Sequence, residues 1–294
     1  MKRRDLLQLA GNGFGLLGAA RVLQGASAEA VAKQPHFKPK AKRVIFLFLN
    51  GGLSQVDSFD PKPVLTKRHG EPMPGEKIKT DRASGNLMKS PFEFRRCGKS
   101  GLEVSDIFPK IGSRIDDFCV IRSMHSDNGN HGPSLLMMNS GHGLAGRPAM
   151  GSWLSYGLGT ENENLPGFVA LCPGYPVLGP QLWSSGFLPS VHQGTYVRNS
   201  EKDISGLLPN IRNASVSVEQ QASQLALLDK LDRSYVQKVE SPELESAIAS
   251  MEVAFRMQAE APDTFDITKE PAAVRERYGS HDFGRGCPHG LTPD

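Results

Sequence analysis

The segment that follows the apolar run 44–49 carries polar side chains of the types that bind metals and anions. The run is rich in Val, Ile and Phe, and it stops at the turn Asn50-Gly51-Gly52. Such a run predicts a strand buried on both faces of a parallel sheet. Asp57 and Asp60 follow closely, and open α/β sheets bind ligands beyond the carboxyl ends of their strands. The pattern therefore indicates a metal or anion site, with Asn50, Asp57 and Asp60 as metal ligands. The alternative is a polar loop without chemistry.

A second group of ligand-type side chains begins at His125. The apolar run 118–121 predicts another strand, and the chain after it carries His125, Asp127 and His131. These side chains again stand at the carboxyl end of a predicted strand, where α/β proteins place their sites. The segment 125–142 is therefore the second candidate site segment.

Within this segment, His131 is expected at the start of a helix. Gly132 and a proline precede Ser134 and an apolar stretch, and proline suits the first helical turn. The free N–H groups and the dipole of a helix N-terminus favour a phosphate or sulfate group, so Gly132, Ser134 and His125 are candidate anion-binding residues. His131 could act as a nucleophile, a metal ligand or a general acid. The alternative is a capping histidine bonded to the backbone.

The N-terminus has the features of an export signal. A basic head contains Arg3 and Arg4, a mildly apolar stretch follows, and a small-residue cleavage site ends at Ala28. The paired arginines resemble the twin-arginine signal, which the export machinery reads as an address. We therefore expect a signal peptide at 1–28 and a mature chain, 29–294, that is periplasmic or secreted. The alternative is an exposed amphipathic terminus. No later stretch is apolar enough to predict a transmembrane segment.

The composition argues against nucleic acid as a partner. The chain has 34 Lys and Arg residues and 31 Asp and Glu residues, and removing the signal leaves the two nearly balanced. A protein that binds nucleic acid needs a basic face for the phosphates. The four cysteines form no C-x-x-C pair, so they indicate neither a metal site nor a disulfide scaffold. Cys119 and Cys172 lie in apolar runs and are expected to be buried; one disulfide is left open, with its pairing undetermined.

The rest of the chain predicts a mixture of strands and helices. Met251 and Phe255 share a helix face and are expected in the core rather than at a cofactor. Gly141 is the expected stop of the helix that begins near His131. Short strands are expected at 92–94, 102–104 and 166–171, and helices at 107–115, 220–239 and 242–261, the last two shielding a sheet.

Four motifs resemble a large bacterial family, domain of unknown function 1501. They read RVIFLFLNGGLSQVDSFDPKP, NHGPSLLMMNSGH, GRPAMGSWLSYGLGTENENLPGFVAL and WSSGFLPSVHQGTYV, and the resemblance runs to about Cys287. Members are commonly exported and are grouped with the alkaline-phosphatase-like superfamily, which includes sulfatases. The resemblance implies an α/β fold with a mostly parallel sheet flanked by helices. It also implies a divalent metal ion, which could be Zn, Ca or Mg.

The resemblance also assigns roles to the candidate residues. Asn50 stands where the superfamily has a metal-binding Asp, so Asp57 or Asp60 would have to supply the missing charge. His131 stands where the superfamily has its Ser, Thr or formylglycine-forming Cys, and Leu135 replaces the Arg of the sulfatase segment. Both departures argue against ordinary sulfatase chemistry. They leave open a phosphohistidine route and a metal-ligating histidine.

Family members continue beyond the region that Cys287 closes here, with an Arg-rich helix and a late Asp- and His-bearing segment. We therefore expect 29–294 to be the N-terminal part of such a domain, with the C-terminal part missing through truncation or a frameshift. The expected function is metal-dependent hydrolysis of a phosphate or sulfate ester, inactive or incomplete in this form. The alternatives are a non-catalytic exported protein that binds anionic glycans or partners on the same fold, and a non-functional fragment.

Overall fold

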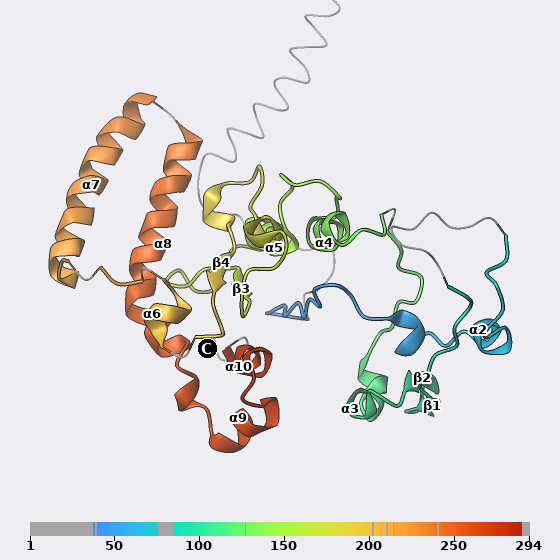
Figure 1. Ribbon diagram of the computed structural model, residues 1–294. Helices are drawn as coiled ribbons and strands as arrows, with labels where there is room; N and C mark the ends of the chain where they lie inside the picture. Colours follow the sequence, from blue (N-terminus) through green and yellow to red (C-terminus); the bar gives the residue numbers. More distant parts are fainter. Residues whose placement is uncertain are drawn as a thin grey trace, which may run out of the picture. The chain divides into compact units, whose positions relative to one another are not determined.

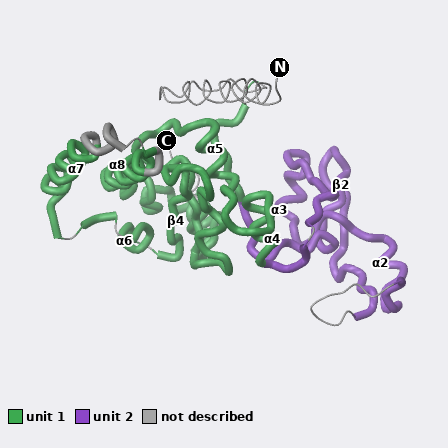
Figure 2. Tube along the Cα trace, turned by 90° about the horizontal axis from the view of Figure 1, so that it is seen from above, with its two compact units in different colours: residues 1–46, 132–294 green, residues 47–131 purple. Residues whose placement is uncertain are grey.

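The computed structural model forms two compact units (Figure 2). It describes residues 38, 40–75, 85–126, 128–201, 203–209, 211–213, 215–239 and 241–289. Unit 1 comprises 1–46 and 132–294, and unit 2 comprises 47–131. The predicted signal residues Arg3, Arg4 and Ala28, and Asp127 of the second site segment, lie outside the described residues.

Unit 2 is built around an antiparallel hairpin of β1 (Phe94–Cys97) and β2 (Leu102–Ser105). The carboxylate of Asp116 closes the hairpin loop, because it accepts hydrogen bonds from the backbone N–H groups of Lys99 and Ser100 at 2.8 and 2.9 Å. These bonds hold the pKa of Asp116 below its ordinary value. The remaining elements are η1 (Gln55–Asp57), α2 (Pro63–Lys67), α3 (Pro109–Gly112) and η2 (Ile115–Asp117).

Unit 1 contains a parallel pair of short strands and most of the helices (Figure 1). Val169 pairs with Thr195 in the register of β3 and β4. The strands are β3 (Val169–Leu171) and β4 (Thr195–Val197); the 3-10 helices are η3 (Gly179–Trp183), η4 (Ser190–His192) and η5 (Ile267–Lys269); and the α-helices are α4 (His131–Ser140), α5 (Met150–Leu158), α6 (Ile204–Leu207), α7 (Val218–Val239), α8 (Pro242–Thr264), α9 (Ala272–Tyr278) and α10 (Asp282–His289).

The buried core of unit 1 joins the second half of α8 to β4 and α6. Apolar side chains from these elements and from the chain around them meet in one cluster. Removing this apolar surface from water is the main force that holds the elements together. The buried members are Val197, Leu207, Leu208, Ile211, Met257, Ala261 and Phe265.

Local capping signals explain where α7 and α8 begin. Ser217 and Gln220 form a reciprocal capping box: the Ser217 hydroxyl accepts from the Gln220 N–H at 3.2 Å, and the Gln220 side chain accepts from the Ser217 N–H at 3.1 Å. Ser241 caps α8 by accepting from the N–H of Leu244 at 3.3 Å. Both helices were predicted from the helical spacing of their apolar residues, and they run antiparallel to each other (Figure 1).

The strands predicted at 44–49 and 118–121 are wrong as regular elements. Neither run belongs to the described sheets, and both are exposed: Leu47 by 66 % and Ile121 by 62 %. A strand needs neighbours to accept its backbone hydrogen bonds, and the described residues place no strand against these runs. The described part of the chain is therefore mixed α/β with two small sheets, and the large parallel sheet expected from the resemblance is not seen in it.

The structure confirms some of the other predicted elements and buried residues and corrects others. The strand predicted at 102–104 is confirmed, whereas the one predicted at 92–94 begins at Phe94 and runs to Cys97, and the one predicted at 166–171 is limited to Val169–Leu171. Gly141 is confirmed as the stop of α4, with a φ of 73°. The helix predicted at 107–115 is shorter, ending at Gly112 before a separate 3-10 turn.

Cys119 is exposed rather than buried, and none of the four cysteines forms a disulfide. Met251 is 62 % exposed, because Met257 and Ala261 occupy the buried face of α8 instead. None of the described helices has the length and apolar character needed to cross a membrane.

Candidate functional site

The turn at the end of the predicted first strand is present in unit 2. The N–H of Gly52 donates to the carbonyl of Leu49 at 3.0 Å and closes the turn. Gly51 and Gly52 have φ angles of 95° and 81°, a region that residues with a Cβ rarely adopt. The two glycines are thus required by the backbone, and Asn50 lies exposed at the tip.

His131 lies beside this glycine turn. A Cβ placed on Gly51 would be 3.9 Å from Cε1 of the His131 imidazole, a normal van der Waals contact. His131 and the glycine turn, far apart in sequence, are therefore neighbours within unit 2. His131 is also the first residue of α4, so it stands at a helix start, where the backbone N–H groups and the dipole favour negative charge.

Asp57 and Asp60 lie on the short segment after the turn. The Ser54 hydroxyl donates to Oδ2 of Asp57 at 2.6 Å, and this bond, with a second from Ser90, holds the pKa of Asp57 below its ordinary value. Asp60 is paired with the ammonium of Lys62 at 2.6 Å. Asp57 is therefore a stable anion, whereas the charge of Asp60 is balanced by its neighbour.

As they stand, these residues do not fit a divalent metal ion. In the part of the chain that the structure describes, no three His, Cys, Asp or Glu side chains gather closely enough to hold one. Asn50, Asp57 and Asp60 offer oxygen ligands of the type that Mg²⁺ and Ca²⁺ prefer. However, Asp57 is held by Ser54 and Asp60 by Lys62, so both carboxylates would have to turn away from their partners. The metal stays a prediction.

The other predicted anion-binding residues lie on the approach to α4 and in its first turn. His125 is exposed in the loop before the helix. Gly132 and Ser134 belong to α4 and are half-buried, and they are counted with unit 1. Past the helix end, His142 accepts from the N–H of Leu144 at 3.1 Å in a local turn. His142 is therefore occupied locally, unlike His131 beside the glycine turn.

One pair of polar side chains in unit 1 was not expected from the sequence. The hydroxyl of Ser155 on α5 lies 2.9 Å from Nδ1 of His192 on η4. Burial lowers the pKa of His192, so the imidazole is neutral at neutral pH. Nothing in the spacing of these two residues signals the contact, because it depends on how η4 packs against α5.

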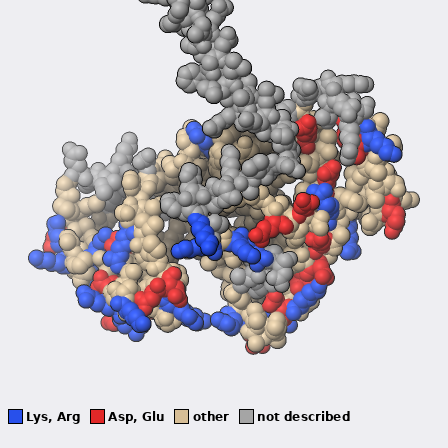
Figure 3. Space-filling model, turned by 180° about the vertical axis from the view of Figure 1, so that it is seen from behind, with Lys and Arg blue, Asp and Glu red and all other residues tan. Residues whose placement is uncertain are grey.

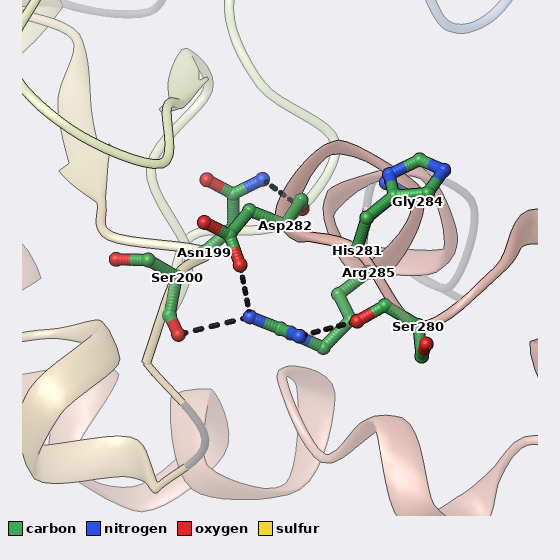
Figure 4. Close-up of polar contacts among 7 residues, drawn as sticks. All are labelled: Asn199, Ser200, Ser280, His281, Asp282, Gly284 and Arg285. Atoms are coloured by element: carbon green, nitrogen blue, oxygen red, sulfur yellow. Dashed lines mark hydrogen bonds and ion pairs between the residues drawn. The ribbon is translucent and has the colours of Figure 1, made fainter.

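A polar network fixes α10 to the chain after β4 (Figure 4). It was not predicted from the sequence. The guanidinium of Arg285 donates to the carbonyls of Ser280 and Ser200 at 2.5 and 3.1 Å and pairs with the carboxylate of Asp282. Asn199 donates to the carbonyl of Asp282 at 3.1 Å. The Gly284 N–H donates to Nδ1 of His281 at 2.9 Å.

This network has a structural role, because it holds α10 against the chain after β4; we call it the α10 clamp. Asn199 is 3 % exposed. A Cβ on Gly286 would lie 2.0 Å from Nδ2 of Asn199, so no larger residue fits there. Close packing of this kind explains the glycine by sterics alone.

The comparisons decide the family. The family model described as Protein of unknown function (DUF1501) matches residues 41–288. The chain belongs to the DUF1501 family. No curated protein and no solved structure matches the chain. The resemblance drawn from the four motifs is therefore confirmed, and the glycine turn, His131, the Ser155–His192 pair and the α10 clamp all lie within the DUF1501 region.

Charged side chains of both signs lie on the face of this DUF1501 protein that Figure 3 shows. On the face seen in Figure 3, Lys and Arg alternate with Asp and Glu, in keeping with the near balance of the composition. A face of mixed charge provides no broad field of one sign that would attract an anion.

Proposed function

We propose that this DUF1501 protein is an exported hydrolase of phosphate or sulfate esters in which His131 is the reacting side chain. The observation that carries the proposal is the position of the His131 imidazole beside the Gly51-Gly52 turn and at the start of α4. Backbone N–H groups at such turns and helix starts are suited to the oxygens of a phosphate or sulfate group. The same place then offers both an anion-binding backbone and a nucleophile.

The proposed ester hydrolysis needs no reacting side chain other than His131. A ring nitrogen of the neutral imidazole attacks the phosphorus or sulfur atom, and the bond to the ester oxygen breaks. The departing alkoxide takes up, through water, the proton that the second ring nitrogen releases. Water then cleaves the new bond to nitrogen: its hydroxyl goes to the phosphorus or sulfur atom and its proton returns to the ring, which releases phosphate or sulfate and restores the imidazole. The Gly51 N–H of the turn would stabilise the charge that develops on an outer oxygen, since the Gly52 N–H already donates to the carbonyl of Leu49.

The divalent metal, Zn, Ca or Mg, remains a part of the proposal without a described site. Asn50, Asp57 and Asp60 would hold it only if Asp57 turned away from Ser54 and Asp60 from Lys62. The general chemistry of such an ion is to polarise the ester and neutralise its charge. Metal analysis of the purified protein tests this part by itself, and an Asp57→Ala variant that keeps the same metal content would contradict it.

We also propose the alkaline-phosphatase-like fold and a location outside the cytoplasm for the family member. The parallel pairing of β3 with β4 supports a fold of this class. The second candidate function is a non-catalytic protein that binds anionic glycans or partners. The ion pair between Asp60 and Lys62 favours it, because it neutralises a carboxylate that a hydrolase would need for its metal.

The test of the proposed function is titration with inorganic phosphate and inorganic sulfate, followed through the imidazole NMR signals. We expect the His131 signal to shift until it saturates, because the anion would sit against its ring. The signal of His142 should not move, since that ring is engaged in a local turn. A His131 signal indifferent to both anions would overturn the proposal for hydrolase and binder alike.

A further inference from the structure

Four aromatic rings form a continuous row in unit 1. Phe187 meets Trp153 with ring centroids 5.7 Å apart, Trp153 meets Tyr156 at 6.2 Å, and Tyr156 meets His192 at 5.3 Å. All three contacts are edge to face, which is a favourable arrangement for aromatic pairs. We call these four residues the aromatic row.

The aromatic row is open to solvent. Trp153 is 45 % exposed, Tyr156 53 % and Phe187 65 %. By contrast Trp183 is 7 % exposed and stacks on Tyr196 with centroids 5.4 Å apart. The packing of unit 1 thus buries one aromatic stack and leaves another uncovered. Contiguous exposed apolar side chains of this kind mark interaction sites more often than scattered ones.

Hydrogen bonds hold the row in place. The N–H of Ala149 and the hydroxyl of Ser152 both donate to the carbonyl of Ser184, at 2.8 and 3.1 Å. These bonds tie α5 to the segment that carries Phe187. The Ser155 hydroxyl, 2.9 Å from Nδ1 of His192, fixes the imidazole at the other end. A surface fixed in this way loses little conformational entropy when a ligand binds.

The segments that carry the row have no charged residue. No Lys, Arg, Asp or Glu lies between Arg147 and Glu161, or between Glu163 and Arg198. Burial lowers the pKa of His192, so the row is also uncharged at neutral pH. The chemistry offered here is ring faces and edges, hydroxyls and one neutral imidazole, which suits an uncharged ligand that has both apolar faces and hydroxyl groups.

We propose that the aromatic row is a binding site for neutral oligosaccharides. A pyranose ring has C–H groups on its faces and hydroxyls around its edge, so it can pack on Trp153 and Phe187 while its hydroxyls bond to water and to His192. Anionic lipid surfaces would instead require basic side chains, which these segments lack. The site goes beyond the ester chemistry proposed for His131 and does not depend on it.

The test is calorimetric titration of the purified full chain with neutral hexasaccharides of glucose, linked β-1,4, β-1,3 or α-1,4, and of N-acetylglucosamine. We expect at least one of them to bind, with Trp153→Ala and Phe187→Ala each weakening binding on the order of tenfold. Trp153→Phe should retain most of the affinity because it keeps a ring. Tyr175→Ala is the matched control: Tyr175 is 63 % exposed but contacts Tyr196 rather than the row.

Three outcomes would overturn the proposal. One is the absence of binding to all four hexasaccharides by a chain whose circular dichroism shows it to be folded. Another is binding that Trp153→Ala and Phe187→Ala leave unchanged, or that Tyr175→Ala weakens equally. The last is sedimentation of the wild-type chain as a dimer that Trp153→Ala converts to monomer, since a second copy would then be the occupant of the row.

Discussion

At the scale of residues, the candidate site rests on features that are local in the sequence. Two adjacent glycines after an apolar run predict a sharp turn, and Gly51 and Gly52 form it with positive φ angles. A proline after Gly132 predicts a helix start, and α4 begins at His131. The sequence could therefore indicate both halves of the site, because each depends on backbone preferences within a few residues.

The side-chain contacts of the site were less predictable. The pairing of Asp60 with Lys62 and the bond between Ser155 and His192 depend on rotamers and on packing between elements. The same holds for Cys119, which was expected to be buried because of its apolar neighbours and is exposed. A one-dimensional pattern does not contain that information, since burial is decided by what packs against the segment.

His192 should make stability depend on pH. Burial lowers its pKa in the folded chain, so the unfolded chain binds this proton more readily. Its contribution to the free energy of unfolding is complete above the ordinary histidine pKa of about 6.5 and is lost as the pH falls below that value. Urea unfolding at pH values on both sides of it should show the loss, and His192→Asn should reduce the slope. An equal reduction in His142→Asn, which alters a half-buried ring in a local turn, would contradict the assignment.

At the scale of elements, helices were predicted better than strands. The helices α4, α7 and α8 carry their own start signals, such as the box of Ser217 and Gln220 and the cap at Ser241. A strand has no such autonomy, because its hydrogen bonds go to another part of the chain. The apolar runs 44–49 and 118–121 have strand composition, yet they lie outside both described sheets.

The capping box at Ser217 provides a test at this scale. Ser217→Ala removes the acceptor for the Gln220 N–H and should lower the free energy of unfolding by about 1 kcal/mol. Ser223→Ala is the control on the same helix, because its hydroxyl only bonds back to the carbonyl of Glu219 and its loss should be nearly neutral. Chemical denaturation followed by circular dichroism measures both. Equal losses in the two variants would show that the box contributes nothing specific.

At the scale of the whole molecule, membership of DUF1501 over 41–288 is the firmest result. The four motifs spread along the chain indicated it, and the mixed α/β character agrees with the expected class. The extent of the sheet was not predictable, since the composition of a strand does not state how many partners it has. What the described residues show instead is apolar surface in contact with solvent: Val44 is 64 % exposed and Leu47 66 %.

The exposed apolar run 44–49 should bind a hydrophobic dye. Anilinonaphthalene sulfonate fluoresces on uncovered apolar surface, and Val44→Ser combined with Leu47→Ser should lower its signal with the purified chain. Val177→Ser is the control, because Val177 is 73 % exposed but lies outside the run, and single exposed apolar residues are ordinary. A wild-type chain that binds no dye and melts in a sharp cooperative transition would show that the run is covered in solution.

The central claim is that His131 is the reacting side chain of an ester hydrolase, and the most direct measurement is hydrolysis of aryl phosphate and aryl sulfate by the purified protein. Because Asp60 is neutralised by Lys62, we predict slow turnover that falls on the order of a hundredfold or more in His131→Ala. His142→Ala, a histidine in a local turn beyond α4, should leave the rate unchanged. Turnover that survives His131→Ala would contradict the account, and so would turnover that His142→Ala abolishes equally.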